Sequence, residues 1–325
     1  MTARILLLLL LICTPLGAQQ APIGIIDLFG LIHTQPDAVR AALGLRVGDS
    51  VPASFEAAIR RLEGLPGVQS ASLNPVCCEE GKSILYVGIV EEGFTPLTWN
   101  PVPTGEVRIP DSIRALGSAF EDALWEALRQ GDAAEDRSAG HALMHFPGAR
   151  KIQEQFPALA EANLDLLRTV LHNSAEAGDR ALAAQIIAYT ANKQAVVPDL
   201  VTASRDPAEP VRNNAIRALA VMASGDPVTV KVPAEPFVAL LESPFWTDRN
   251  KSSLALMELT NSRDPELMAA LRPARAALIE MARWKSPGHA LAALVIIGRL
   301  AGLTEQEIGE AWNSGDREKI IRASQ

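Results

Sequence analysis

The pattern of hydrophobic and polar positions divides the chain into a short mixed region and a long helical region. Between residues 21 and 93, three apolar runs have the spacing of strands and enclose two segments with helical spacing. In the last run, Leu85, Val87 and Ile89 occupy every second position, which predicts a strand with one buried face. The expected order is strand, helix, helix, strand, strand, which is an α+β arrangement.

From Asp111 to the C-terminus, the chain is rich in Ala and Leu, and its apolar positions recur with helical spacing. Between the two regions, residues 94–110 contain four prolines and one glycine, and we interpret them as an interdomain linker. We therefore expect a small α+β domain followed by an all-α part, so that the whole protein is mainly α-helical.

The helical region contains an internal repeat. When three helical segments are aligned on Arg180, Arg212 and Arg249, each has a small residue three positions later and a large apolar residue seven positions later. A fourth copy carries His289 in the arginine position. The copies are 32, 37 and 40 residues apart. This spacing is typical of helix pairs that stack into a solenoid, because one pair alone cannot bury its apolar face.

The segment RDPAEPVRNNAIRALAVMA (205–223) closely resembles a HEAT repeat. The resemblance implies a HEAT-type solenoid of about four helix pairs over residues 164–302. Residues 111–163 are then a helical lead-in, and residues 303–325 are a C-terminal helical cap with a polar outer face.

The resemblance also implies a structural role for the repeated arginines, which in HEAT repeats usually bond within or between repeats. Contacts to a ligand are the alternative. Asp206 is expected to start a helix through a capping box with Glu209, in which the aspartate accepts from exposed backbone N–H groups. Asp264 is expected to play the same part before the next helix.

The mixed region contains Gly48-Asp49, LPGV at residues 65–68, and an expected strand at residues 86–91. With these features it resembles a POTRA domain. The resemblance implies a β-α-α-β-β domain over residues 21–93. POTRA domains usually bind other proteins, sometimes by adding a strand to the edge of their sheet.

The N-terminus has the features of a secretory signal peptide over residues 1–18. Arg4 supplies a positive charge, Ile5 to Ile12 are all apolar, and the small residues Gly17-Ala18 suit a cleavage point. The apolar run is far below the ~20 residues that a membrane-spanning helix needs. We expect export to the periplasm or cell envelope of a bacterium and no membrane span after cleavage. The alternative is an uncleaved N-terminal signal anchor.

The charge of the chain disfavours one class of partner, and the sequence does not determine the chemical state of the two adjacent cysteines. The chain has 30 basic and 38 acidic residues, a net charge of −8, which disfavours nucleic acid because its phosphates must be neutralised by Lys and Arg. Cys77 and Cys78 are adjacent. Plain thiols or a structural bridge, an intermolecular bridge, and a redox or metal site are all open interpretations.

His141 and His145 are the strongest candidates for a chemical site. In a helix, a spacing of four residues places two imidazoles on one face, as in helical metal sites, and Glu135 and Asp136 are close in sequence. No third ligand is evident, and Pro147 would end such a helix almost at once. We favour a packing or capping cluster, and a metal site is the alternative.

Trp246 follows Pro244-Phe245 at a turn between repeats and is the best candidate for an exposed aromatic contact to a partner. The sequence therefore predicts an exported, non-catalytic interaction or scaffold protein with no cofactor. It is expected to bind a protein partner through the solenoid groove and through the sheet edge. The alternative is a metal-dependent enzyme that uses His141 and His145.

Overall fold

The computed structural model describes residues 21–94, 97–132, 134–224 and 230–324. The expected signal peptide, residues 1–18, lies outside these ranges. The backbone of Cys77 and Cys78 belongs to a strand, but their side chains lie outside what the structure describes. Within the described ranges, no helix is both long enough and apolar enough to cross a membrane.

The N-terminal part is a three-stranded sheet with two helices, in the predicted order of elements. The central strand β3 runs parallel to β1 and antiparallel to β2, so the sheet order is β1-β3-β2. The elements are β1 (Ile23–Phe29), α1 (Pro36–Leu43), α2 (Glu56–Glu63), β2 (Val68–Glu79) and β3 (Lys82–Glu91).

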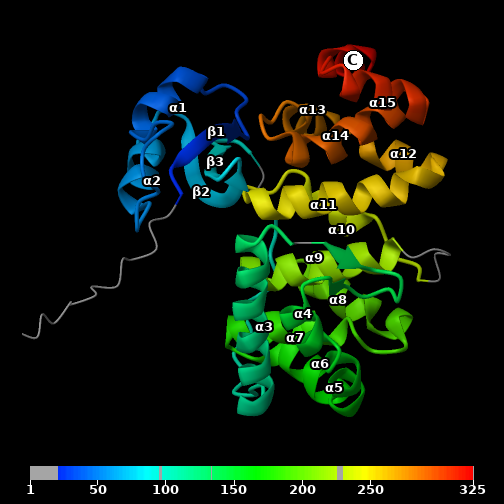
Figure 1. The fold of residues 1–325 in the computed structure, drawn as a ribbon. Helices are drawn as coiled ribbons and strands as arrows, with labels where there is room; N and C mark the ends of the chain where they lie inside the picture. Colours follow the sequence, from blue (N-terminus) through cyan, green and yellow to red (C-terminus); the bar gives the residue numbers. More distant parts are fainter. Residues whose placement is uncertain (1–20, 95–96, 133, 225–229, 325) are drawn as a thin grey trace, which may run out of the picture.

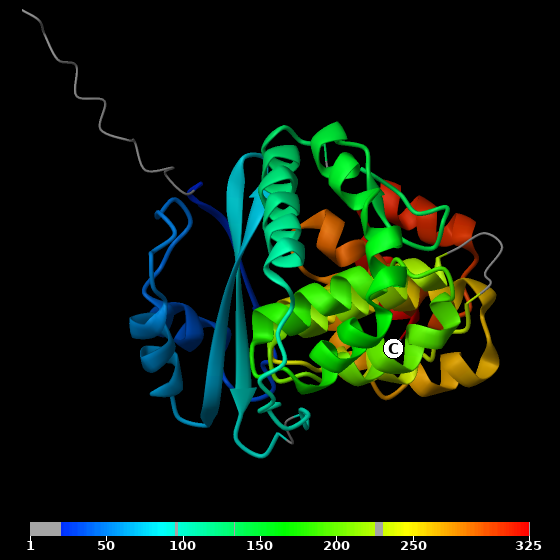
Figure 2. The same ribbon diagram turned by 90° about the horizontal axis from the view of Figure 1, so that it is seen from below.

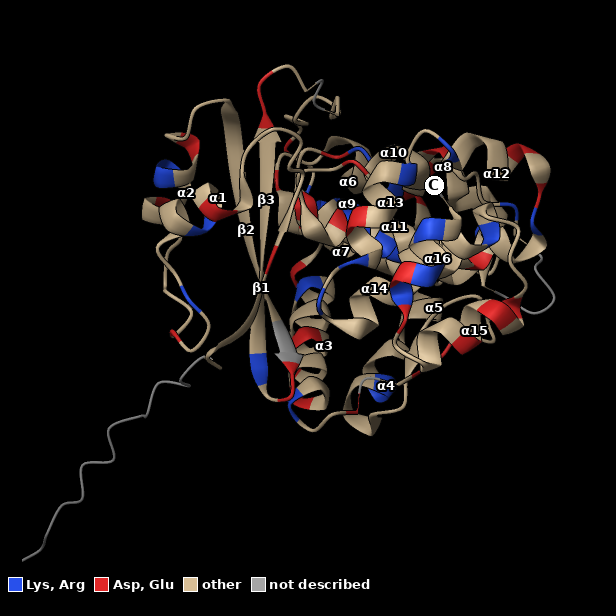
Figure 3. Ribbon diagram, turned by 90° about the horizontal axis from the view of Figure 1, so that it is seen from above, with Lys and Arg blue, Asp and Glu red and all other residues tan. Residues whose placement is uncertain are grey.

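Both faces of the sheet are covered. Helices α1 and α2 pack on one face through Val39, Leu43 and Leu62, and the helical part of the chain packs on the other (Figure 2). Seen from above, the layers follow as α1/α2, sheet and solenoid (Figure 3). β3 is consequently buried from Ser83 to Glu91. The prediction of a strand with only one buried face was wrong, because the second cover comes from residues distant in sequence.

The expected helical solenoid is confirmed (Figure 1). Four helix pairs follow one another, and the second helices of the pairs stack in chain order as one layer. The pairs are α6 (Leu164–Asn173) with α7 (Ala177–Ile187), α8 (Val197–Ala203) with α9 (Glu209–Ala223), α10 (Glu235–Leu240) with α11 (Trp246–Leu259), and α13 (Arg275–Ala282) with α14 (Pro287–Leu300).

Further elements surround these pairs. They are α3 (Asp111–Arg129), β4 (Glu135–Asp136), β5 (Leu143–Met144), α4 (Pro147–Gln153) and α5 (Phe156–Ala162) before the pairs, the short turns η1 (Lys193–Val196) and η2 (Thr260–Ser262) and helix α12 (Pro265–Leu271) between them, and α15 (Glu305–Asn313) and α16 (Arg317–Ala323) after them.

Buried ion pairs join successive repeats through the aligned arginines. Arg180 donates to both carboxylate oxygens of Asp206 at 2.8 Å, and the side chains of Arg212 and Asp248 are 0% exposed. Arg249 donates to Glu280 at 2.8 Å. Each arginine thus ties the second helix of one pair to the following repeat.

The two aspartates expected to cap helices behave differently. Asp264 accepts hydrogen bonds from the backbone N–H groups of Glu266 and Leu267 at the start of α12. The capping box predicted for Asp206 was wrong. The next helix begins only at Glu209, so this glutamate cannot reach back as the box requires. Asp206 does accept from the backbone N–H of Ala208 at 2.8 Å, and its carboxylate also binds Arg180 of the preceding repeat.

The segment that joins the two parts of the chain packs along the turns inside the helix pairs. Asn100 N–H donates to the carbonyl of Arg205, and Gly105 N–H donates to the carbonyl of Asn173. Ile109 N–H then donates to Asp179 at the start of α7. The segment therefore crosses the repeats in the direction opposite to the order in which the chain builds them.

Candidate functional site

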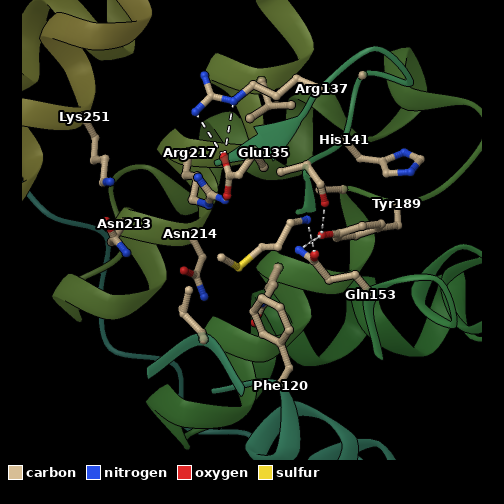
Figure 4. Close-up of a pocket in the computed structure, with 18 of the residues that line it drawn as sticks. Phe120, Glu135, Arg137, His141, Gln153, Tyr189, Asn213, Asn214, Arg217 and Lys251 are labelled. Carbon is tan, nitrogen blue, oxygen red and sulfur yellow. Dashed lines mark hydrogen bonds and ion pairs between the residues drawn. The ribbon is translucent and has the colours of Figure 1, made fainter. Parts of the chain in front are cut away.

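A cavity of about 390 Å³ opens on the layer formed by the second helices of the repeats. Helices α7, α9 and α11 form its floor. Helix α3 and the β4–β5 hairpin form its side walls (Figure 4). Three consecutive repeats thus contribute to one concave site.

One wall of the cavity is charged. Glu135 on β4 accepts hydrogen bonds from Arg137, at 3.1 Å to Nη2, and from Nη2 of Arg217 on α9. Burial alone would raise the pKa of Glu135. The attraction of Arg217 and Arg137 outweighs it and holds this pKa below its usual value, so the carboxylate is ionised at neutral pH.

Lys251 on α11 lies on the same side of the cavity (Figure 4). Burial, together with the nearby Arg217, lowers the pKa of Lys251 to about 8. The ammonium group is therefore mostly charged at neutral pH. In the part of the chain that the structure describes, Lys251 forms neither an ion pair nor a hydrogen bond.

The opposite wall is apolar. Phe120, Leu124 and Leu128 reach the cavity from α3, and Met144 reaches it from β5. Trp125, on the same helix, is 57% exposed, and Leu128 is 45% exposed. The cavity therefore combines a basic wall with an apolar wall that continues onto the surface.

The two histidines do not form the arrangement expected of a helical metal site. The helix predicted around residues 135–148 was wrong, because this stretch forms the β4–β5 hairpin, with His141 before β5 and His145 after it. His141 lines the cavity, its Nδ1 lies 3.2 Å from Lys193 Nζ, and its ring packs on Tyr189. Burial and Lys193 lower the pKa of His141 to about 4. A neighbouring cation disfavours a metal ion there.

No group of three His, Cys, Asp or Glu residues suited to a metal ion occurs within the described ranges.

Trp246 is not an exposed contact, and that expectation was wrong. The side chain is 8% exposed and stacks on Tyr86 of β3, with ring centroids 4.9 Å apart. The Tyr86 hydroxyl in turn lies 2.7 Å from Nδ1 of His289, the residue that occupies the arginine position of the fourth repeat. Trp246 thus binds the sheet of its own chain.

A second, smaller cavity of about 200 Å³ lies at the seam between the sheet and the solenoid. Glu280 lines it and accepts from the backbone N–H of Gly30 at 2.8 Å and from Arg249 at 2.8 Å. These bonds join the end of β1 to α11 and α13 across the seam.

Sequence reasoning missed the polar and charged residues that the repeat helices contribute to the larger cavity. Asn214 and Lys251 each come two positions after a repeated arginine, and Gln185 and Arg217 each come five positions after one. These offsets place all four on the same face of the stacked helices. The alignment of the repeats therefore contained the signal, although only the buried positions were read from it.

Comparison with known proteins gives a limited likeness. No protein-family model matches the chain, and no curated protein matches it. Among solved structures, the chain is similar to the designed armadillo repeat protein YIII(Dq)4CqI and to a computationally designed armadillo repeat protein for modular peptide recognition. In each case the identity is 20%, the TM-score is 0.39, and the match covers 66% of this chain and 97% of the other.

It is also similar to the designed armadillo repeat protein YIII(Dq.V1)4CPAF in complex with the peptide (KR)4. There the identity is 19% and the TM-score 0.38, with 68% of this chain and 97% of the other covered.

Proposed function

We propose that this chain is a non-catalytic scaffold protein that binds a segment of a protein partner in the cavity on its solenoid. The observation that carries the proposal is the cavity itself, to which α7, α9 and α11 of three consecutive repeats contribute. Stacked repeats form extended concave surfaces, and a site spread over several repeats suits an extended segment.

The form of the cavity supports a peptide-sized occupant. A volume of about 390 Å³ accommodates a few side chains and no folded domain. Its apolar rim includes Leu128 on α3, which is 45% exposed and offers apolar surface to a partner.

The N-terminal part is proposed to be a POTRA-like domain with a second binding surface. The β-α-α-β-β order and the sheet order β1-β3-β2 support this assignment. β2 is an edge strand, and a partner strand could pair with its outer side. The edge of β1 is partly engaged, because Ile23 exchanges backbone hydrogen bonds with Gly48 and Asp49, and Lys285 Nζ donates to Ile26.

We further propose export to the envelope of a bacterium, on the basis of residues 1–18 and their charge and hydrophobicity. Fractionation of host cells that carry a tagged full-length chain tests this point. Recovery of a shortened protein in the periplasmic fraction is expected, whereas a full-length protein in the cytoplasm would contradict export.

The binding proposal is tested by filling the cavity. Gln185→Trp places a large side chain in its floor, whereas Gln306→Trp on the exposed surface of α15 is the matched control. Envelope extract of the host is passed over each immobilised variant and over the wild type. A protein retained by the wild type and by Gln306→Trp, but not by Gln185→Trp, is the expected result. Equal retention by all three would show that the cavity does not bind the partner.

A further inference from the structure

The charge of the cavity is opposite in sign to that of the whole protein. Three cations line it, Arg137, Arg217 and Lys251, and one carboxylate, Glu135. His141 adds no charge at neutral pH, since its pKa is about 4. The cavity therefore has an excess of two positive charges, although the full sequence carries a net charge of −8.

The single carboxylate does not neutralise these cations. Glu135 is shared between two arginines. Arg137 donates to it through Nε and Nη2, and Arg217 donates to it through Nη2. Over the described residues, the other nitrogen atoms of Arg217 have no acceptor within hydrogen-bonding reach. Among the same residues, the ammonium group of Lys251 also has no acceptor. Arg217 and Lys251 therefore both keep N–H donors available to a ligand.

An uncompensated cation in a recessed site is costly, because it has lost part of its hydration without gaining a counter-ion. A carboxylate relieves this cost, since it accepts charge-assisted hydrogen bonds from ammonium and guanidinium groups alike. Asn213 and Asn214 line the same wall (Figure 4). Asn213 accepts from Thr247 and Asn214 donates to the carbonyl of Ala181, so Nδ2 of Asn213 and Oδ1 of Asn214 are left to suit the backbone of a peptide.

The apolar wall favours a ligand that carries an apolar side chain next to its carboxylate. Phe120 and Leu124 face the cavity from α3, across from the cations of α9 and α11. In an extended peptide, successive side chains point to opposite sides. A segment in which acidic and apolar residues alternate would therefore meet the basic wall and the apolar wall at the same time.

We propose that the cavity binds an extended acidic segment of the partner, with a side-chain carboxylate between Lys251 and Arg217 and a neighbouring apolar side chain against Phe120. This inference rests on the proposed function and gives it a specific ligand chemistry. The contacts at the basic wall are electrostatic and those at the apolar wall are not. Added salt should therefore reduce the binding affinity without abolishing binding.

The test uses a capped peptide, Gly-Ser-Leu-Glu-Leu-Glu-Ser-Gly, with blocked ends, and the same peptide with Gln in place of both Glu. Binding to the mature full chain is measured by calorimetry. A third peptide, the Gln version with a free C-terminal carboxylate, distinguishes a side-chain acid from a chain terminus. Lys251→Met is the test variant, and Lys151→Met on the exposed surface of α4 is the matched control.

The Glu peptide is expected to bind at least tenfold more tightly than the Gln peptide. Lys251→Met should weaken the Glu peptide at least tenfold, and Lys151→Met should leave it unchanged. Equal binding of the Glu and Gln peptides, no saturable binding of the Glu peptide, or its undiminished binding to Lys251→Met would overturn the inference. Tight binding of the free-acid Gln peptide alone would overturn the internal segment in favour of a chain end.

These outcomes separate the inference from the proposed function. If Lys251→Met retains the host partner that Gln185→Trp loses, the cavity binds a partner but the acidic segment is wrong. If the Glu peptide binds through Lys251 while no host protein is retained in a Gln185-dependent manner, the ligand chemistry stands and the proposed scaffold role fails.

Discussion

The ion pair between Arg212 and Asp248 offers the sharpest test of how the repeats are held together. Both side chains are 0% exposed, and Arg212 Nε lies 3.1 Å and 3.0 Å from the two carboxylate oxygens. Arg212 also donates to the carbonyl of Asp206 and packs on the ring of Trp99 at 4.1 Å. Arg212→Met keeps most of the apolar volume and removes the charge, so Asp248 retains only the hydroxyl of Ser243.

A buried carboxylate that has lost its cation costs about 3–5 kcal/mol of unfolding free energy. Replacing both partners by apolar residues is often close to neutral. The double variant Arg212→Met/Asp248→Leu leaves the carbonyl of Asp206 without its donor, which costs about 1–3 kcal/mol. We therefore expect the double variant to be more stable than Arg212→Met, with a coupling energy of at least about 2 kcal/mol.

Urea unfolding followed by circular dichroism measures these differences. Arg322→Met, which removes an exposed ion pair at 3.9 Å, is the control and should change stability by less than about 1 kcal/mol. Burial already raises the pKa of Asp248, and Arg212 opposes that effect. Without the arginine, this pKa rises further above its unfolded value. The folded protein then gains a proton first as pH falls, so the defect of Arg212→Met should shrink in acid.

Two results would refute this reasoning. If Arg212→Met loses less than about 1 kcal/mol, the pair does not stabilise the joint between repeats. If the losses of the two single variants simply add in the double variant, the two side chains act independently. A defect that stays constant from neutral pH to about pH 4 would show that Asp248 is not the group left uncompensated.

Three further outcomes are expected. Lys251→Met should raise the unfolding free energy at neutral pH by about 1–3 kcal/mol in urea titrations, because the lowered lysine pKa of about 8 means that folding disfavours the charged ammonium group. The gain should vanish above pH 10.5, where the lysine is neutral in the unfolded chain as well. Burial lowers the pKa of His289 to about 4, so unfolding free energy should fall between pH 6.5 and 4. His289→Gln should make that part of the curve less steep, while His141, whose pKa is also lowered to about 4, keeps part of the slope. A Cβ at Gly88 would lie 2.6 Å from the carbonyl oxygen of Pro244, so Gly88→Val should speed hydrogen exchange at the start of α11 and spare α6 and α7; unchanged exchange would argue against this close contact.

The repeat was predictable from the sequence because its signal is local and recurs. Ala183 and Ala215 are small because the helices of a pair approach closely there, and both are 0% exposed. Ile187 and Leu219 fill the layer between the pairs. These positions follow from helical periodicity alone, and each copy of the pattern supports the others.

The errors share a different cause, namely contacts between residues far apart in the chain. Trp246 seemed suited to a partner because its own repeat does not bury it, and its cover is Tyr86 of a distant strand. Asp206 was assigned to the helix that follows it, but its charge is used by the repeat before it. His141 and His145 obey a helical spacing that Gly140 and the β4–β5 pairing override.

The cavity combines both kinds of information. Its floor follows the offsets of the repeat and could have been read from the alignment. Its walls could not, because the positions of α3 and of the β4–β5 hairpin depend on how the linking segment lies across the helix turns. Local patterns thus define the floor of the site, and tertiary packing completes it.

The docking of the sheet on the solenoid has a consequence for how the chain reaches its folded state. Most solenoids touch only neighbouring repeats, so they can form and peel apart one repeat at a time. Here the hydroxyl of Tyr86 is hydrogen-bonded to His289, which is 203 positions later in the chain. Asp27 accepts from the backbone N–H of Lys285, which is 258 positions later. Because the sheet precedes the solenoid in the chain, it leaves the ribosome first and keeps one apolar face uncovered until the solenoid has been made. A carrier that holds the chain unfolded until synthesis is complete would spare that face from aggregation.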